Sequence, residues 1–215
     1  MAQVLSVNVA VPRSDPWGDI GVTGIDKRPV DGPVQVRAPG PRGVSGVIGD
    51  QILDARHHGG DDQAVYAYAR EDLDGWQAEL GRPLPGGVFG ENLTTSGIDV
   101  TGALIGERWQ VGDEAVLEVS LPRIPCGTFA AWMTDKGWIK WFTARGLPGA
   151  YLRVIVPGEI RAGDAISVVS QPDHDVTIGV TFRALTLESE LLPRLLAVEA
   201  LPTVVREKAA RRTAA

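Results

Sequence analysis

EAVLEVSLPRIPCG (residues 114–127) joins a run typical of a β-strand to the only cysteine of the 215-residue chain. The first half is rich in Val and Leu, which favour extended structure. Two prolines and Arg123 then crowd the approach to Cys126, a setting that a small buried hydrophobic residue does not need. The strand therefore bears on the fold class, and the cysteine bears on function.

Further short runs of this kind predict a mainly β fold. The chain contains 26 Gly and 15 Pro, which separate these runs along the sequence. Short β-branched segments bounded by turn-forming residues are typical of an all-β sandwich or barrel. The expected strands are AQVLSVNVA (2–10), PVQVR (33–37), GVSGVIGD (43–50), EAVLEVS (114–120), YLRVIVPG (151–158) and DAISVVS (164–170), with GDQILD (49–54) as a further candidate.

Two stretches within the β region carry the apolar spacing of helices. DDQAVYAYAREDLDGWQAEL (61–80) places apolar side chains three to five residues apart from Val65 to Leu80, which favours one amphipathic helix that ends at Gly81. TFAAWMTDKGWIKWFTARG (128–146) predicts a helix in two pieces, interrupted at Gly137. We expect both to lie around the strands.

The character of the chain changes near residue 172. The segment SELLPRLLAVEALPTVVREKAARR (189–212) is rich in Leu, Ala, Glu and Arg and has no strand alternation. Thr186–Glu188 and Leu201–Pro202 are expected to interrupt it. We therefore predict two domains, a β domain at 1–172 and a C-terminal appendage of short helices at 173–215.

Composition excludes several classes of protein. A net charge of −6 does not suit a nucleic-acid binder, and the basic end of the tail is interpreted as a solvated helix face. A single cysteine cannot form an internal disulfide, which indicates a reducing compartment. The N-terminus lacks the pattern of a signal peptide, and no apolar window is long enough to span a membrane. The expected location is the cytoplasm, with no membrane partner.

Cys126 is the strongest functional candidate. An unpaired cysteine is commonly a buried small hydrophobe. This one lies between a strand and a predicted helix start with Arg123 nearby, and these neighbours are expected to lower the pKa of the thiol. A thiolate attacks electrophiles or binds soft metals. A Cys–His hydrolase built with His57 or His58 is an alternative.

The segment RHHGGDD (56–62) has two interpretations. His57 and His58 could bind a metal, although adjacent residues on a strand point to opposite faces and seldom share one ion. His174 is the only other histidine, so a closed zinc site has few ligands to draw on. Gly59 and Gly60 before a helix start would offer backbone N–H groups to an anion.

The other polar positions are less specific. Lys27 and Arg28 are either a surface pair or part of an anion site. Asn92, between Gly90–Glu91 and an apolar run, either ties down a turn or faces a ligand. Arg153 lies inside the strand-like YLRVIV, so its side chain either reaches solvent or binds an anion.

Taken together, five segments in order resemble the MOSC family, the domains related to the C-terminal part of molybdenum-cofactor sulfurases, and most of all its YiiM-like branch. The resemblance spans about residues 3–170, and the tail resembles the small three-helix domain that follows in this branch. The five segments are GIDKRPV (24–30), HHGGDDQAVYAY (57–68), FGENLT (89–94), LIGERWQVGDEAVLEVSLPRIPC (104–126) and GAYLRVIVPGEIRAGD (149–164).

The resemblance implies a mostly antiparallel MOSC-type β-barrel with short peripheral helices. It also implies binding of the molybdenum cofactor, a pterin dithiolene with a terminal phosphate, and reduction of small N-hydroxylated compounds such as N-hydroxylated purine bases. An external electron-donor protein would then supply electrons, because the chain has no flavin or haem motif. Pyridoxal phosphate is not expected, and the oligomeric state is left open, a homodimer included.

The resemblance also suggests roles for individual residues. Cys126 would ligate molybdenum, and His57 or His58 would deliver a proton during cleavage of the N–O bond. In amidoxime-reducing relatives an arginine stands where this chain has Gly90 and Glu91. The residues expected to contact the cofactor are Lys27, Arg28, His58, Gly59, Gly60, Asn92, Arg123 and Arg153.

Two other functions are compatible with the same residues. The chain could be a binding module that carries the cofactor or persulfide sulfur and has no redox turnover of its own. It could also be a barrel whose pocket binds a different phosphate-bearing ligand.

Overall fold

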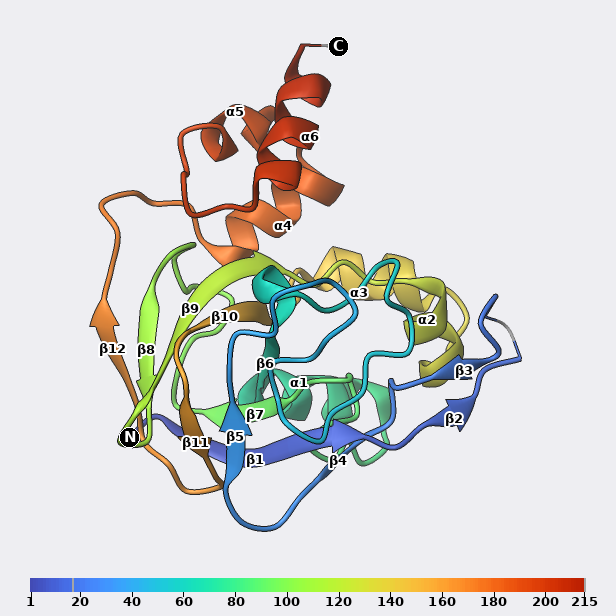
Figure 1. Ribbon diagram of the computed structural model, residues 1–215. Coiled ribbons are helices and arrows are strands. Elements are labelled where there is room, and N and C mark those ends of the chain that lie inside the picture. Colours follow the sequence, from blue (N-terminus) through green and yellow to red (C-terminus); the bar gives the residue numbers. More distant parts are fainter. Residues whose placement is uncertain (17, 215) are drawn as a thin grey trace.

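The main feature of the computed structural model, which describes residues 1–16 and 18–214, is a mixed eight-stranded sheet (Figure 1). The strand order is β12-β8-β9-β10-β6-β7-β1-β4. The β6–β7 pair is parallel, and the other pairs of this sheet are antiparallel. Its strands are β1 (Gln3–Ala10), β4 (Lys27–Pro29), β6 (Val65–Ala69), β7 (Leu93–Ser96), β8 (Arg108–Val111), β9 (Ala115–Pro122), β10 (Ala150–Val156) and β12 (Ile166–Ser170).

The centre of the sheet is the long pair β9–β10. Residues along β9 largely alternate between buried and half-buried positions, as a strand with one face on the core does. Tyr151, near the start of β10, lies opposite Leu121 of β9 and Tyr66 of β6. This register places the end of β9, which leads to Cys126, beside the start of β10.

The expected closed antiparallel barrel is not found, and the expectation of a mainly β chain is corrected. Strand and helix take nearly equal shares, 27% and 26%. β12 and β4 are the edges of the sheet, although a bridge between Gln3 and Ala165 and the Val4 N–Asp164 O hydrogen bond of 2.9 Å bring β1 and the start of β12 together at one end. The fold is thus a large curled mixed sheet with several helices.

The stretch 61–80 explains part of this difference. Its first half is a 3₁₀ turn, η1 (Asp61–Gln63), followed by the fully buried strand β6, and only α1 (Arg70–Leu80) is helical. Periodicity cannot distinguish a short buried strand from a buried helix. α1 connects β6 to β7, which lets them pair in parallel. Gly81 ends α1 with a φ of 63°, as predicted.

Two of the predicted strands are absent from the structure, whereas the predicted helix break is present. The runs at 43–50 and 49–54 are not strands; Val47 contributes one bridge to Val36. The break at Gly137 is confirmed, because it separates α2 (Gly127–Met133) from α3 (Trp138–Arg145). Two small sheets complete the strands, namely β2 (Arg13–Ser14) with β3 (Val22–Thr23) and β5 (Val34–Val36) with β11 (Gly158–Ile160).

Helices α1, α2 and α3 enclose a cluster of buried aromatic rings. Phe129 of α2 packs against Phe89 and against Trp138 and Phe142 of α3, with ring centroids 5.2 to 5.4 Å apart. Cys126 and Tyr151 border this cluster. The packing fixes the start of α2, and with it the cysteine, against the rest of the fold.

The C-terminal helices gather at one end of the molecule (Figure 1). They are α4 (Ile178–Thr186), η2 (Ser189–Leu191), α5 (Leu192–Leu195) and α6 (Thr203–Thr213), with the interruptions that the sequence predicted. The division at residue 172 stays a prediction, and Trp17 and Ala215 lie outside the described residues. Among the helices described, none is both long and apolar enough to cross a membrane.

Candidate functional site

A pocket of about 670 Å³ lies where the β2–β3 hairpin, the loop at 51–59, β6, the turn at 90–92, the segment 121–128 and the start of β10 meet. This volume is in the range of small-molecule and cofactor sites. The predicted residues that line it are Lys27, His57, His58, Gly59, Asn92, Arg123 and Cys126. Segments far apart in sequence thus meet at one cavity.

Cys126 occupies the residue just before the first turn of α2. Its φ of −125° and ψ of 173° are extended, and the side chain is half-buried. Because it lines the pocket and also borders the aromatic cluster, the thiol is accessible from the cavity on a rigid support. It can act as a ligand to a soft metal or as a nucleophile.

Arg123 is the unusual charge of the pocket. It is only 5% exposed, donates a hydrogen bond to the carbonyl oxygen of Phe89, and lies over the rings of Phe129 and Tyr66 at 4.4 and 5.2 Å from their centroids. Within residues 1–16 and 18–214 it makes no ion pair. A buried cation without a carboxylate partner favours an anionic ligand.

Gly90 makes room for this arginine. A Cβ atom at Gly90 would lie 3.1 Å from Nη1 of Arg123, and the φ of 76° is one that glycine adopts readily. The neighbouring Glu91 is fully buried and turns away from the pocket: its carboxylate accepts hydrogen bonds from Gly87 N, Phe89 N and Thr94 Oγ1 at 2.6, 2.9 and 3.0 Å. Glu91 therefore holds the turn and leaves the charge of Arg123 unneutralised.

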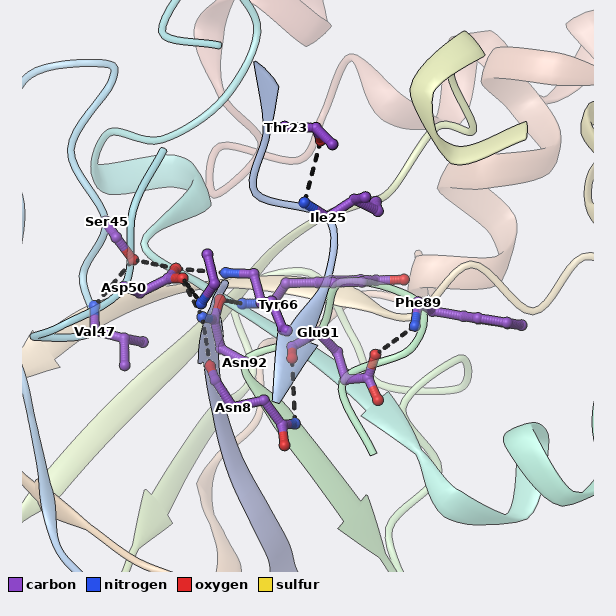
Figure 2. Close-up of polar contacts among 12 residues, drawn as sticks. Asn8, Thr23, Ile25, Ser45, Val47, Asp50, Tyr66, Phe89, Glu91 and Asn92 are labelled. Carbon is purple, nitrogen blue, oxygen red and sulfur yellow. Dashed lines mark hydrogen bonds and ion pairs between the residues drawn. The ribbon is translucent and has the colours of Figure 1, made fainter. Parts of the chain in front are cut away.

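Asp50 does not itself line the pocket, but it is the centre of a polar network, here called the pocket floor, that holds the lining residues Lys27 and Asn92; Figure 2 shows its contacts with Ser45 and Asn92. Its carboxylate forms an ion pair with Lys27 and accepts hydrogen bonds from Ser45 Oγ at 2.8 Å, Asn92 Nδ2 at 2.9 Å and Ala10 N at 2.8 Å. Burial alone would raise the pKa of Asp50, but the charge of Lys27 and these hydrogen bonds lower it. The positive charge of Lys27 is therefore largely balanced by the carboxylate of Asp50.

Asn92 has little hydrogen-bonding capacity left for a ligand. Its Oδ1 accepts from Tyr66 N at 3.1 Å, and its Nδ2 donates to Asn8 O at 3.2 Å as well as to Asp50 (Figure 2). The side chain ties β1, β6 and the pocket floor together. Asn92 therefore fixes a turn and also lines the pocket, and its contact with a ligand stays a prediction.

The two histidines differ in their surroundings. His57 is exposed and His58 is half-buried, and both lie in a turn, not on a strand. Burial lowers the pKa of His58 to about 4, and the charge of Arg123 adds to this. His58 is therefore neutral at neutral pH. A neutral imidazole suits a hydrogen bond to a ligand better than proton delivery.

This pKa predicts a pH dependence that replacement of His58 removes. The folded state favours the neutral form of His58. Its contribution to the free energy of unfolding is therefore fully present above the unfolded pKa of 6.5 and is lost as the pH falls toward 4. Relative to His58→Gln, the wild type should lose about 2 to 3 kcal/mol of unfolding free energy between pH 7 and pH 4. Urea titrations of both proteins measure this, and parallel pH curves would contradict it.

Three of the residues predicted to contact the cofactor, Arg28, Gly60 and Arg153, do not line the pocket. Arg28 has a side chain 56% exposed and pairs with Asp26 at 3.0 Å, outside the pocket lining. Gly60 donates its N–H to Val44 O at 3.0 Å, and the predicted helix after it is a 3₁₀ turn followed by a strand, so no helical anion cradle forms there. Within residues 1–16 and 18–214 the closed zinc site is not assembled either, because His174 accepts from Val176 N and does not line the pocket.

Arg153 is used to join parts of the fold. It bonds to Asp62 at 2.7 Å, to Glu118 at 3.0 Å and to the carbonyl oxygen of Ala200 at 2.8 Å. These contacts connect β10 to β9, η1 and the C-terminal helices. The side chain neither reaches open solvent nor lines the pocket.

The sequence interpretation missed two residues that line the pocket, Tyr151 and Gln63, and the buried Asp50 that contacts the lining residues Lys27 and Asn92. Asp50 closes the run GVSGVIGD, which resembled an ordinary strand and turn. Tyr151 lines the pocket with a hydroxyl that has no hydrogen bond to any described residue, whereas the Tyr66 hydroxyl donates to Pro148 O at 2.8 Å. Gln63 lay inside a predicted helix. No local signal distinguishes these residues, because their proximity arises from the tertiary fold.

Comparison with known proteins identifies the family. The model of the MOSC domain matches residues 54–167. YflK of Bacillus subtilis is 32% identical over 176 residues, which cover 81% of this chain and 76% of that protein. A protein named Reductase from Gibberella moniliformis is 34% identical over 152 residues, 69% of this chain but only 26% of that longer protein.

A solved structure agrees over the whole length. YiiM from Geobacillus stearothermophilus superposes with a TM-score of 0.80 at 27% identity and covers 99% of both chains. The match thus includes the curled sheet, the pocket region and the C-terminal helices. The chain belongs to the MOSC domain family and to its YiiM-like branch.

Proposed function

We propose that this chain binds the molybdenum cofactor in the 670 Å³ pocket and reduces small N-hydroxylated compounds there. The observation that carries the proposal is Arg123, a buried cation in the pocket wall without a carboxylate partner among the described residues, three positions from the accessible thiol of Cys126. Family membership and the reductase relative support the choice of cofactor and reaction class.

The residues present fit this cofactor. The pocket is large enough for a pterin with its side chain, Arg123 offers a charge to an anionic group, and Cys126 offers the soft sulfur that molybdenum accepts beside dithiolene sulfurs. When bound, the cofactor would supply a redox-active metal at the cysteine. Lys27 contributes less, because Asp50 already pairs with it.

The protein would position the substrate and assist proton transfer. Conversion of an N-hydroxyl group to an N–H group and water consumes two electrons and two protons. The electrons would come from an external redox protein. Burial raises the pKa of Tyr151 against the charge of Arg123, so its hydroxyl stays protonated and can donate a hydrogen bond to a leaving oxygen. Neutral His58, which also lines the pocket, can hold the substrate by a hydrogen bond.

Replacement of Arg123 should weaken cofactor retention. The Arg123→Gln protein loses a charge-assisted contact, which contributes about 1.5 to 3 kcal/mol, or roughly tenfold to a hundredfold in affinity. Pterin and molybdenum content after extensive dialysis measure the loss. Arg28→Gln is the matched control, because this exposed arginine lies outside the pocket and should leave retention unchanged. Equal retention in all three proteins would remove Arg123 from the site.

The reaction itself is tested with a small artificial electron donor. Protein from a host that makes the cofactor should reduce 6-hydroxylaminopurine to adenine when a reduced viologen supplies electrons, with product measured by chromatography. Cofactor-loaded protein that gives no product with this or other N-hydroxylated substrates would instead be a carrier of cofactor or sulfur. The result therefore distinguishes the enzyme from the binding module.

A further inference from the structure

Gln63 is a pocket residue whose side-chain amide oxygen is unused by the described part of the protein. It is the last residue of η1 and lines the pocket next to Tyr66. Its Oε1 atom is buried and has no hydrogen-bond partner among the residues that the structure describes. Asn92 in the same pocket differs, because its amide makes three hydrogen bonds to the protein.

An unpaired buried amide is unfavourable for folding but suited to binding. Buried polar atoms in folded proteins nearly always have partners, and an orphan lowers stability. Gln63 sits on a firm support, since its own N–H donates to Gly60 O at 3.0 Å and the buried strand β6 begins two residues later. The amide is therefore held in place beside the pocket, with its acceptor oxygen shielded from water and without a partner among the described residues.

We propose that Gln63 reads the edge of a heterocyclic ring bound in the pocket. A glutamine amide presents one acceptor and one donor side by side, which matches a ring with neighbouring donor and acceptor atoms, such as a ring N–H beside a C=O or a ring nitrogen beside an amino group. The half-buried ring of Tyr151 lines the same pocket and offers apolar surface to such a ligand, and the buried ring of Tyr66 supports it with the centroids 5.0 Å apart.

This inference rests on the proposed function in that the ring belongs either to the pterin of the cofactor or to a purine-like substrate. The two sources share the same edge chemistry. Direct binding of each free heterocycle to the purified chain separates them, and it requires neither metal nor turnover. Its outcome is therefore independent of whether the chain is a reductase.

Binding of pterin and of 6-hydroxylaminopurine is measured by calorimetry on the wild type and on Gln63→Met. The variant should bind at least one of the two about tenfold more weakly. Weakening of pterin alone assigns Gln63 to the cofactor ring, and weakening of the purine alone assigns it to the substrate. For pterin, methylation at ring N3 removes the donor, and the difference between the proteins should then disappear.

Two further measurements keep the test decisive. Gln35→Met is the matched control, because Gln35 is an exposed glutamine on β5 outside the pocket lining, and it should leave both affinities unchanged. Gln63→Met should not lower the Tm and should raise it by a few degrees, since an unpaired amide is removed. Unchanged binding in Gln63→Met, equal losses in the control, or no binding of either probe to the wild type would overturn the proposal.

Discussion

Cys126→Ala will lower the reduction of N-hydroxylated compounds to the background rate while the protein stays folded. The thiol is the only sulfur ligand that a cysteine can provide in this chain, and it lies at the pocket wall at the start of α2. The Cys126 side chain makes no capping hydrogen bond to α2 and its backbone is extended, so alanine fits there and removes only the sulfur. The fold should therefore persist, and the loss should come from the site itself.

Turnover with a reduced viologen measures the effect, and circular dichroism checks the fold. Ile124→Ala is a suitable control, because this neighbouring side chain is 46% exposed and its truncation removes no ligand. Full turnover in Cys126→Ala would show that the assigned metal ligand is wrong. Lost turnover together with lost helical signal would assign the thiol a structural role instead.

Among substitutions at and around the pocket, Asp50→Asn should lower the free energy of unfolding most. The Asp50 side chain is fully buried and that of Lys27 is 8% exposed, so neutralising the carboxylate leaves a buried ammonium group without its counter-ion. Breaking one side of such a pair costs about 3 to 5 kcal/mol. Asn92 and Ser45 would also lose an acceptor, so the pocket floor should loosen. Urea unfolding measures the change.

Two companion variants test the cause. Asp54→Asn removes a carboxylate that pairs with Arg56, whose side chain is 55% exposed, and should change stability by less than about 1 kcal/mol. Adding Lys27→Met to Asp50→Asn removes the stranded charge and should recover much of the loss. A loss below about 1 kcal/mol for Asp50→Asn alone would show that the ion pair does not organise the floor.

Local patterns predicted a useful part of this protein. The break at Gly137 and the end of α1 at Gly81 followed from glycine alone. The segment leading to Cys126 indicated where the pocket lies, and both Arg123 and Cys126 line it. Strand ends and the loops after them often place polar groups at cavities. Family membership also followed from the order of the five segments.

Other features depend on contacts that no local pattern encodes. Val65–Ala69 belongs to a stretch whose apolar spacing favours a helix, yet it is a strand. Burial on both faces and pairing with β7 decide this. Arg153 was expected at an anion, but Asp62 and Glu118 lie across neighbouring elements and take up its charge. Asp50 became recognisable as the centre of a network only in the fold, where the distant Ala10, Lys27 and Asn92 join the nearby Ser45 around its carboxylate.

Metal analysis of the wild-type protein from a cofactor-producing host tests the central claim most directly. We predict that molybdenum co-purifies with the wild type together with a pterin that denaturation releases. A protein that contains no molybdenum, and takes up none when folded protein is mixed with free cofactor, would contradict it. The pocket would then serve a different anion at Arg123.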